Sequence, residues 1–463
     1  MIITAPEVIP APPAPPSRRT ATVLSWSVAG ALAAAYLLLS VLNHRRLHTT
    51  GFDLGIFEQA VRSYAEGGPG LVPLKGPGFP QLGDHFAPVL ALLAPVYRAA
   101  PSAVTLLVVQ ALLLAVAAVP IVSFAHRRLG LLAAITAGAG YGLSWGIAQT
   151  VGFDFHEVCF AVPLLAFSLV AVAERRPRAA ALWALPLLLV KEDLGLTVAA
   201  IGVLLAAYGA RRLGAGLALA GAAGTALAMG VVIPALNPHD DYAYTATVAA
   251  GLYQQGAQVK LLTVLTLLAP TAGVALRSPL LLVAVPTLLW RFTSGNPNYW
   301  GTGFHYSAVL MPVMMVAFVD GVARWRAAGG RLRSSLAVVA YAVSLTVTVA
   351  LLPRYPLAQL ASAQTWHGDP RAAAAHRVLD LIPDGATVSA ANQLAPQLTG
   401  RTTVTLFGTD YPGPAPQYIV FDSRHPGFPL GRDSQRRRVE AAQATGYRTV
   451  AQDDGFVLLT ILR

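Results

Sequence analysis

The sequence predicts a mainly α-helical, polytopic membrane protein of about 11 transmembrane helices, with a small α/β domain at its C-terminal end. Of its 463 residues, 55% are hydrophobic and only 12% are charged, whereas soluble domains carry about 25% charged residues. The mean hydropathy is +0.56. Basic residues gather at the ends of apolar runs, so the net charge of +11 indicates membrane topology and no nucleic-acid partner. The single cysteine, Cys159, excludes an intramolecular disulfide and a cysteine-based metal site.

The N-terminal residues 1–20 are rich in Pro and Ala and end beside an arginine pair, which predicts a disordered cytoplasmic tail. The next run is long enough to cross a membrane, since about 20 apolar residues are needed. A cleaved signal peptide is the alternative for this run, because small residues at 31–35 offer a cleavage site. Residues 21–353 form the predicted transmembrane domain. Its predicted spans are 21–42, 103–125, 131–151, 158–173, 179–190, 194–210, 213–236, 261–276, 280–290, 304–323 and 335–352.

Arginine groups between the spans agree with the positive-inside rule. With the N-terminus in the cytoplasm, these groups all fall inside, and the acidic and aromatic motifs all fall outside. The expected number of spans is 11, give or take two, because the run 179–190 is short for a full span. Arginine greatly outnumbers lysine and the chain is rich in Ala, Gly and Pro, which indicates a bacterial protein. We expect a multi-pass protein of a bacterial cytoplasmic membrane with an extracytoplasmic C-terminus. The arginine groups lie at 127–128, 175–178, 211–212 and 324–333.

Residues 43–101 form the predicted first extracytoplasmic loop, because they are too polar and too rich in Gly and Pro to span as one helix. Two amphipathic pieces, 54–64 and 86–97, are expected to lie on the membrane surface. The segment 51–59, with the sequence GFDLGIFEQ, carries two acidic residues in a chain that has few. We expect the site to be organised around this segment.

Residues 354–463 change in character and predict a soluble extracytoplasmic α/β domain. Helical patterns cover 369–381 and 432–445. Strand patterns cover 387–390, 402–407, 417–422 and 456–462.

Charged residues in or beside spans are costly and usually face a cavity, which makes them functional candidates. Asp53 is the candidate catalytic base, because a carboxylate beside a membrane-bounded cavity can accept a proton from an attacking hydroxyl. The alternative is that Asp53 caps the amphipathic helix that follows it. Acidic clusters recur on the same predicted side, one of them at 239–241, which favours one common site. The substrate-binding candidates are Glu58, Asp84, His85, Asp154, His156, Glu157, Lys191, Glu192, Asp193, Arg291, Tyr299, Trp300 and His305.

Four of these residues are also candidate metal ligands. Carboxylate oxygens and imidazole nitrogens bind divalent cations such as Mg²⁺ or Mn²⁺. The alternative is that these side chains are hydrogen-bonded residues of a helix interface. No other cofactor is expected. The candidate ligands are Asp84, His85, Asp154 and His156.

Basic and aromatic residues at the predicted outer ends of spans suit a phosphorylated sugar. The segment 191–193 lies at a hairpin tip, where its charges either pair with one another or present Lys191 to a phosphate. Arg291 and His305 are placed to hold a lipid phosphate, or else simply extend to the membrane interface. The segment 298–306 mixes aromatic and polar residues as sugar sites do, although aromatic residues are also common at membrane interfaces.

Five motifs together resemble an uncharacterised family of bacterial polytopic membrane proteins, defined as a domain of unknown function. They lie at 52–59, 84–88, 153–157, 191–193 and 382–386, and the resemblance extends from about residue 50 to past 400. That family is in turn similar to the GT-C-fold glycosyltransferases. The resemblance implies a multi-spanning core, a catalytic acid in the first outer loop and a sugar donor linked to polyprenyl phosphate. Asp53 matches the first-loop acid by position, but without a paired Asp-x-Asp or Asp-Glu.

We therefore expect a membrane glycosyltransferase that moves a sugar from a polyprenyl-phosphate donor to a cell-envelope glycan or protein on the outer face. Asp53 would be the base, and Lys191 or Arg291 would hold the donor phosphate and offset the charge of the leaving group. One alternative is a transporter or lipid flippase, which is disfavoured because the ionisable motifs lie at the outer ends of spans and no repeat is visible. The other alternative is a non-catalytic envelope scaffold.

Overall fold

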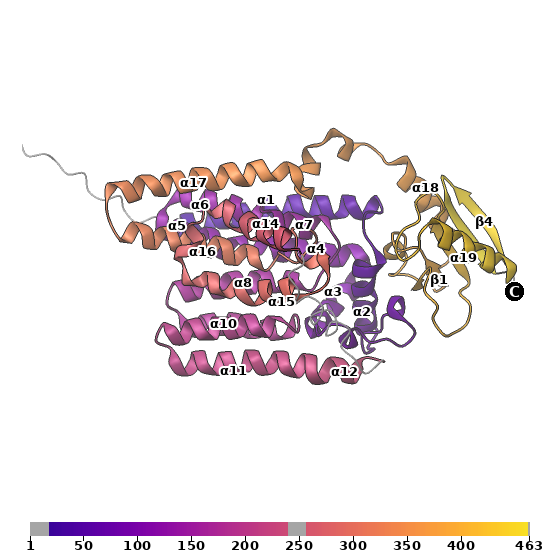
Figure 1. Ribbon diagram of the computed structural model, residues 1–463. Coiled ribbons are helices and arrows are strands. Elements are labelled where there is room, and N and C mark those ends of the chain that lie inside the picture. Colours follow the sequence, from indigo (N-terminus) through magenta and orange to yellow (C-terminus); the bar gives the residue numbers. More distant parts are fainter. Residues whose placement is uncertain (1–17, 239–255, 462–463) are drawn as a thin grey trace, which may run out of the picture.

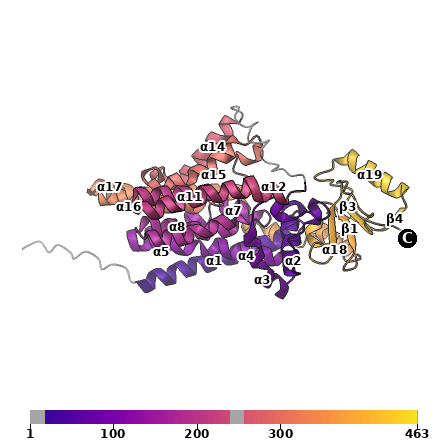
Figure 2. The ribbon, with the colours of Figure 1, turned by 90° about the horizontal axis from the view of Figure 1, so that it is seen from below.

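The computed structural model describes residues 18–238 and 256–461. Its helices run side by side in a long bundle, and a small sheet lies beyond one end of that bundle (Figure 1). Helix α1 (Arg18–Arg45) begins at the opposite end (Figure 2). Most of the predicted tail, at 1–17, and the acidic cluster at 239–241 lie outside the described residues.

Four helical stretches in the described residues are long and apolar enough to cross a membrane by themselves. A fifth would be the pair α6 (Leu131–Gly142) and α7 (Trp145–Gly152), which is bent by 41°. At the bend, the Tyr36 hydroxyl donates a hydrogen bond of 2.7 Å to the Gly142 carbonyl, which has lost its helical partner. The four long stretches are Arg19–Arg45, Ala103–Leu129, Arg211–Leu236 and Leu332–Arg354.

These stretches contain α4 (Ala103–Val116) followed by α5 (Ala118–Leu129), α11 (Arg211–Leu227) followed by α12 (Ile233–Leu236), and α17 (Arg331–Leu351). The other apolar helices are shorter than these four stretches. They are α8 (Val158–Ala173), α9 (Pro177–Ala184), α10 (Leu194–Ala207), α14 (Ala257–Leu268) and α15 (Val285–Thr293). Several of them continue as 3₁₀ turns, as α9 does over Leu185–Leu189. The several apolar spans of the predicted fold class are confirmed, and α14 and α15 stand out on one flank (Figure 2).

One predicted span was misplaced. Helix α16 (Leu310–Ala327) begins six residues after the predicted start at 304, because residues 301–309 form an irregular turn. Phe304 adopts a left-handed backbone conformation with φ of 58°, which a helix does not tolerate. The residues released from the span therefore lie at the end of the bundle that faces the sheet.

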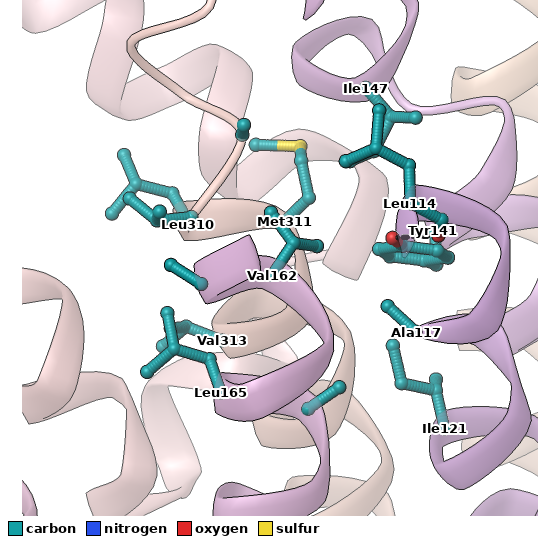
Figure 3. Close-up of a cluster of buried hydrophobic side chains, with 14 of the residues drawn as sticks. Leu114, Ala117, Ile121, Tyr141, Ile147, Val162, Leu165, Leu310, Met311 and Val313 are labelled. Atoms are coloured by element: carbon teal, nitrogen blue, oxygen red, sulfur yellow. Dashed lines mark hydrogen bonds between the residues drawn. The ribbon is translucent and has the colours of Figure 1, made fainter. Parts of the chain in front are cut away.

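The bundle is held together by close packing of apolar side chains. Tyr141, Val162 and Met311 come from α6, α8 and α16 and meet in one buried cluster (Figure 3). Helices α10 and α11 approach one another even more closely through glycines. A Cβ on Gly202 would lie 2.5 Å from the nitrogen of Ala218, so only glycine allows this contact.

The C-terminal α/β domain, residues 370–461, contains a five-stranded sheet of order β2-β1-β3-β5-β4. Strands β1 to β3 are parallel, and β5 runs antiparallel to both β3 and β4. The prediction missed β4, an edge strand whose residues are mostly exposed and lack an alternating apolar pattern. The elements are β1 (Thr387–Ala390), β2 (Thr403–Leu406), β3 (Tyr418–Asp422), β4 (Tyr447–Asp453), β5 (Phe456–Ile461), α18 (Pro370–Leu379) and α19 (Arg432–Ala444).

The first loop lies between the bundle and this domain. It contains a π-helical turn at Gly51–Gly55, α2 (Ile56–Ala65) and α3 (Ala94–Ala99). A short 3₁₀ turn at Pro73–Lys75 lies against β2. The loop therefore contacts both parts of the protein, and its polar residues lie where the two parts meet.

Candidate active site at the end of the bundle

A cavity of about 240 Å³ opens where the bundle meets the first loop. Its walls come from the first loop, from the breaks after α7 and before α10, and from the irregular turn before α16. The predicted outer motifs thus come together although they lie up to 250 positions apart in the chain. The predicted site residues that line this cavity are Asp53, Asp84, His85, His156, Glu157, Lys191, Glu192, Asp193, Tyr299 and His305.

Four other predicted site residues lie outside the cavity and have structural contacts. Glu58 is buried and accepts hydrogen bonds from Tyr97 and Thr399. Trp300 donates to the Ser294 carbonyl at 2.7 Å. The remaining two, Asp154 and Arg291, support the walls of the cavity from behind.

Asp154 holds the backbone just before Asp53. Its two carboxylate oxygens accept hydrogen bonds from the backbone N–H and the hydroxyl of Thr50, at 2.9 Å and 2.7 Å. Gln110 of α4 binds the Asp154 carbonyl at 2.8 Å and the His156 N–H at 3.0 Å. The turn after α7 is therefore fixed both to the bundle and to the first loop.

Arg291 is fully buried at the end of α15 and orders the turn before α16. Its guanidinium donates to the carbonyls of Tyr299 and Gly301 at 2.8 Å and 2.7 Å, and to the Ser307 hydroxyl at 2.9 Å. These bonds occupy the group that the sequence suggested for the donor phosphate. Arg291 instead supports the segment that places Tyr299 and Tyr306 in the cavity wall.

The cavity also contains residues that the sequence prediction missed. Lys75 and Tyr306 contribute polar atoms, while Trp290 and Met229 contribute apolar surface. Lys75 is one of only three lysines in the chain and lies in the same loop as Asp53. That scarcity was the one signal that could have identified it.

Asp53 faces the cavity from the π-helical turn, with 30% of its side chain exposed. Its Oδ1 lies 3.1 Å from Nε2 of His156, and the His156 ring stacks on the His305 ring at 3.4 Å. Burial and the nearby Glu157 carboxylate raise the pKa of Asp53 to about 8. Burial lowers the pKa of His156 to about 3, so His156 is neutral at physiological pH. Asp53 is therefore a carboxyl group that binds protons strongly and has a neutral imidazole partner.

Three cationic groups line the same cavity, each beside a carboxylate. Lys191 lies 2.7 Å from Glu157, Lys75 lies 2.8 Å from Asp84, and His85 lies 2.8 Å from Glu192. Burial disfavours charge on Lys191, but Glu157 and its neighbours raise the Lys191 pKa well above the ordinary value. The pKa of Glu192 is lowered to about 2, because the attraction of His85 outweighs the cost of burial. These pairs place basic side chains around the cavity, which suits the binding of a phosphate.

The four candidate metal ligands do not converge on one point. Each of them has a different partner: Asp84 pairs with Lys75 and His85 with Glu192, while Asp154 bonds to Thr50 and His156 to Asp53. Within residues 18–238 and 256–461, no group of three or more His, Cys, Asp or Glu side chains is arranged to hold a metal ion. The divalent cation stays a prediction, and the chemistry proposed below uses the side chains of the chain itself.

Comparison with solved structures agrees with this architecture. The structure is similar to the crystal structure of ArnT from Cupriavidus metallidurans bound to undecaprenyl phosphate, with a TM-score of 0.53 and 15% sequence identity. The match covers 94% of this chain and 97% of the ArnT chain. At this identity the likeness shows the fold alone, and it confirms the GT-C-like fold class.

Comparison by sequence identifies the family. No curated protein matches this sequence. The family model described as "Predicted membrane protein (DUF2079)" matches residues 43–458, which is most of the chain and includes the first loop, the bundle after α1 and nearly all of the C-terminal α/β domain. This chain is a multi-pass membrane protein that belongs to the DUF2079 family.

Proposed function

We propose that this protein is a GT-C-type membrane glycosyltransferase that moves a sugar from a polyprenyl-phosphate donor to a cell-envelope acceptor on the outer face, with Asp53 as the base. The observation that carries the proposal is that a proton-accepting carboxyl group and cationic side chains line the same cavity. A carboxyl group of raised pKa lies on one segment of the first loop, and three cationic groups line the same cavity. Glycosyl transfer from a lipid phosphate needs both a base and cationic stabilisation of the phosphate.

The reaction requires one proton acceptor and one leaving group. The Asp53 carboxylate takes the proton of the acceptor hydroxyl as its oxygen attacks the anomeric carbon of the donor sugar. The new glycosidic C–O bond forms while the bond from the anomeric carbon to the phosphate oxygen breaks. The polyprenyl phosphate leaves with the electron pair, and its negative charge develops beside the cationic groups.

Lys191 and Lys75 are proposed to bind the donor phosphate. Their ammonium groups lie beside Glu157 and Asp84, respectively, and both line the cavity. Charge-assisted hydrogen bonds to phosphate oxygens are about twice as strong as neutral ones. The carboxylate partners orient each ammonium group before the donor arrives.

The remaining walls suit a sugar attached to a lipid. The rings of Tyr299 and Tyr306 pack edge to face, with centroids 4.7 Å apart, and both line the cavity. Trp290 and Met229 add apolar surface that comes from the bundle. A cavity with a few polar groups and apolar walls is typical of ligand sites. We propose that the sugar binds beside the tyrosines and the lipid beside the apolar residues.

The test is the Asp53→Asn variant in purified protein supplied with a panel of undecaprenyl-phosphate-linked hexoses and pentoses. Release of undecaprenyl phosphate in the presence of membrane-derived glycan acceptors is the measured rate. Loss of a general base is expected to decrease this rate at least about 100-fold. The matched control is Asp433→Asn, because Asp433 is an exposed aspartate of α19 far from the cavity.

Two results would contradict the proposal. Full activity of Asp53→Asn would exclude Asp53 as the base. If the wild-type protein released no undecaprenyl phosphate from any donor but moved the lipid across a vesicle membrane, a transporter or lipid flippase would replace the glycosyltransferase.

A further inference from the structure

We propose that the C-terminal α/β domain is part of the catalytic apparatus, because it positions the backbone segments that carry Asp53 and Lys75. Asn392 and Tyr411 are the positioning residues. This inference rests on the proposed glycosyl transfer, but one of its tests does not depend on transfer. It assigns the domain a role in transfer, which a non-catalytic scaffold would not have.

Asn392 fixes the turn that presents Asp53. The backbone carbonyl of Asn392 accepts a hydrogen bond from the Gly51 N–H at 2.7 Å, and its side-chain Oδ1 accepts one from the Phe52 N–H at 2.8 Å. A Cβ on Gly51 would lie only 2.7 Å from the Cβ of Ala395, so the two backbones touch. The residue after this anchored pair is Asp53, whose position therefore depends on Asn392.

The non-helical backbone of Phe52 strengthens this dependence. Phe52 has φ of −85° and ψ of 46°, which interrupts the helical turn just before Asp53. An interrupted turn lacks some of the hydrogen bonds of a regular helix, and Asn392 supplies a partner for the Phe52 N–H. The Phe52 ring also meets Phe428 of the C-terminal domain edge to face, at 5.4 Å between centroids.

Tyr411 fixes the turn that presents Lys75. Its hydroxyl donates a hydrogen bond of 2.8 Å to the carbonyl of Leu74, the residue before Lys75. Gln59 accepts from the Leu74 N–H at 2.9 Å and donates to the Val404 carbonyl of β2 at 2.9 Å. Both backbone polar groups of Leu74 are thus connected to the C-terminal domain, one directly and one through Gln59.

A buried contact between α2 and the C-terminal domain holds the two parts in register. Glu58 is fully buried and bonded to Thr399, and Arg62 donates to the carbonyls of Thr399 and Thr402 at 3.2 Å and 3.0 Å. A Cβ on Gly400 would lie 2.8 Å from the Glu58 carboxylate. Such tight contacts leave little room for the domain to slide, so its loops can set positions in the cavity.

The proposed base and one proposed phosphate ligand therefore stand on two turns anchored to the same domain. Catalytic groups must be held close to their productive geometry, and a displacement of about 1 Å can cost about 100-fold in rate. Loss of the Asn392 anchor should thus decrease kcat while KM for the donor changes little. Loss of the Tyr411 anchor should also weaken donor binding, because it displaces Lys75. A role restricted to stability would change neither quantity in the folded protein.

The first test compares Asn392→Ala with Asn392→Asp and Gln393→Ala. Asn392→Ala removes the side-chain acceptor of the Phe52 N–H, whereas Asn392→Asp keeps an oxygen there. Gln393 is the exposed neighbour on the same loop and serves as the matched control. We expect Asn392→Ala to decrease kcat about 10- to 100-fold, Asn392→Asp to recover part of it, and Gln393→Ala to match the wild type.

The second test needs no substrate. The carboxyl titration of Asp53 can be followed by infrared difference spectroscopy, with the band identified by its loss in Asp53→Asn. Anchor loss in Asn392→Ala is expected to shift this titration, and Tyr411→Phe is expected to shift it less, because Tyr411 anchors the turn of Lys75 and not that of Asp53. If wild-type transfer is absent but the titration shifts, the proposed function fails and the positioning role survives. Unchanged kcat and titration in a folded Asn392→Ala protein would overturn the inference.

Should Asn392→Ala fail to fold, Asn392→Ser offers a shorter acceptor at the same position. Tyr411→Phe is a second route, because it removes one hydroxyl and keeps the ring that packs near Gly76. Wild-type activity in both Asn392→Ser and Tyr411→Phe would equally overturn the positioning role.

Discussion

The Nε2 atom of His156 lies 3.1 Å from Oδ1 of Asp53, and burial keeps this imidazole neutral by lowering its pKa to about 3. A cationic partner would favour the charged carboxylate and lower the pKa of Asp53. A neutral imidazole can orient Asp53 without that effect, so Asp53 keeps the proton affinity that a base requires. The hydrogen bond from His156 can thus orient the Asp53 carboxyl group without lowering its pKa.

Replacement of His156 should reveal this orienting role. His156→Phe keeps a ring that can stack on His305 but removes the hydrogen bond to Asp53, and it is expected to decrease kcat about 10- to 100-fold. His156→Gln keeps a polar side chain at the position and should retain more activity than His156→Phe. Steady-state rates of both variants provide the measurement, and equal activity in the two would refute the orienting role.

The rate of transfer is expected to rise with pH up to about 8. Burial and the Glu157 carboxylate raise the pKa of Asp53 to about 8, and a base acts only in its deprotonated form. Below that pH the rate should increase about tenfold per pH unit, and above it the rate should level off. A pH profile of kcat tests this. A rate that stays constant or falls across the range would argue against Asp53 as the base.

The two lysines of the cavity should govern donor binding. Lys75→Met and Lys191→Met are each expected to weaken binding of undecaprenyl phosphate about 10- to 100-fold, because a hydrogen bond to a charged group contributes about 1.5–3 kcal/mol. Lys260, the third lysine of the chain, lies over the Trp300 ring at 4.5 Å and outside the cavity. Lys260→Met is therefore the matched control in a titration of the protein with the lipid.

Lys191→Met has a second consequence that must be separated from binding. It leaves Glu157, whose side chain is 1% exposed, without its ammonium partner, and an unpaired buried charge is destabilising. The double variant Lys191→Met/Glu157→Gln removes both charges and should restore stability but not lipid affinity. Recovery of both would show that Lys191 acts only through Glu157.

Glu58 should make stability depend on pH. Burial raises the pKa of Glu58 from its ordinary 4.5 to about 7. Because the folded protein binds this proton more tightly than the unfolded chain does, the contribution is complete below about pH 4.5 and is lost as pH rises through about 7. The shift corresponds to a loss on the order of 3 kcal/mol. Glu58→Gln is expected to abolish this part of the pH dependence of Tm, and an identical Tm profile in both proteins would contradict it.

Much of the fold was accessible from the sequence, because apolar length and the placement of arginines are direct consequences of a membrane environment. The GT-C-like fold class and several apolar spans are confirmed, but only four or five of the described helical stretches, and not eleven, are long and apolar enough to cross a membrane alone. The prediction of individual elements was wrong where local backbone conformation or exposure overrides the pattern of apolar residues. The start of α16 moved because of the left-handed backbone at Phe304, and β4 was missed because an exposed edge strand has no buried face to impose a pattern.

The sequence also predicted that the outer motifs would share a site, and ten of its residues line one cavity. It could not predict which of the candidate side chains point away from the cavity. Glu58 and Asp154 belong to the same motifs but bind Thr399 and Thr50, and such orientation depends on packing that spacing does not encode. Lys75 was missed because it lies in an irregular loop without periodicity.

The hydrogen bond between Phe52 and Asn392 joins residues that are 340 positions apart. During synthesis the segment with Asp53 emerges well before its anchor. If the outer loop and the C-terminal domain assemble in that order, the base remains unanchored until residue 392 has been made. A chain truncated before residue 392 would contain the bundle but lack this anchor, so the proposed base would stand on an unsupported turn.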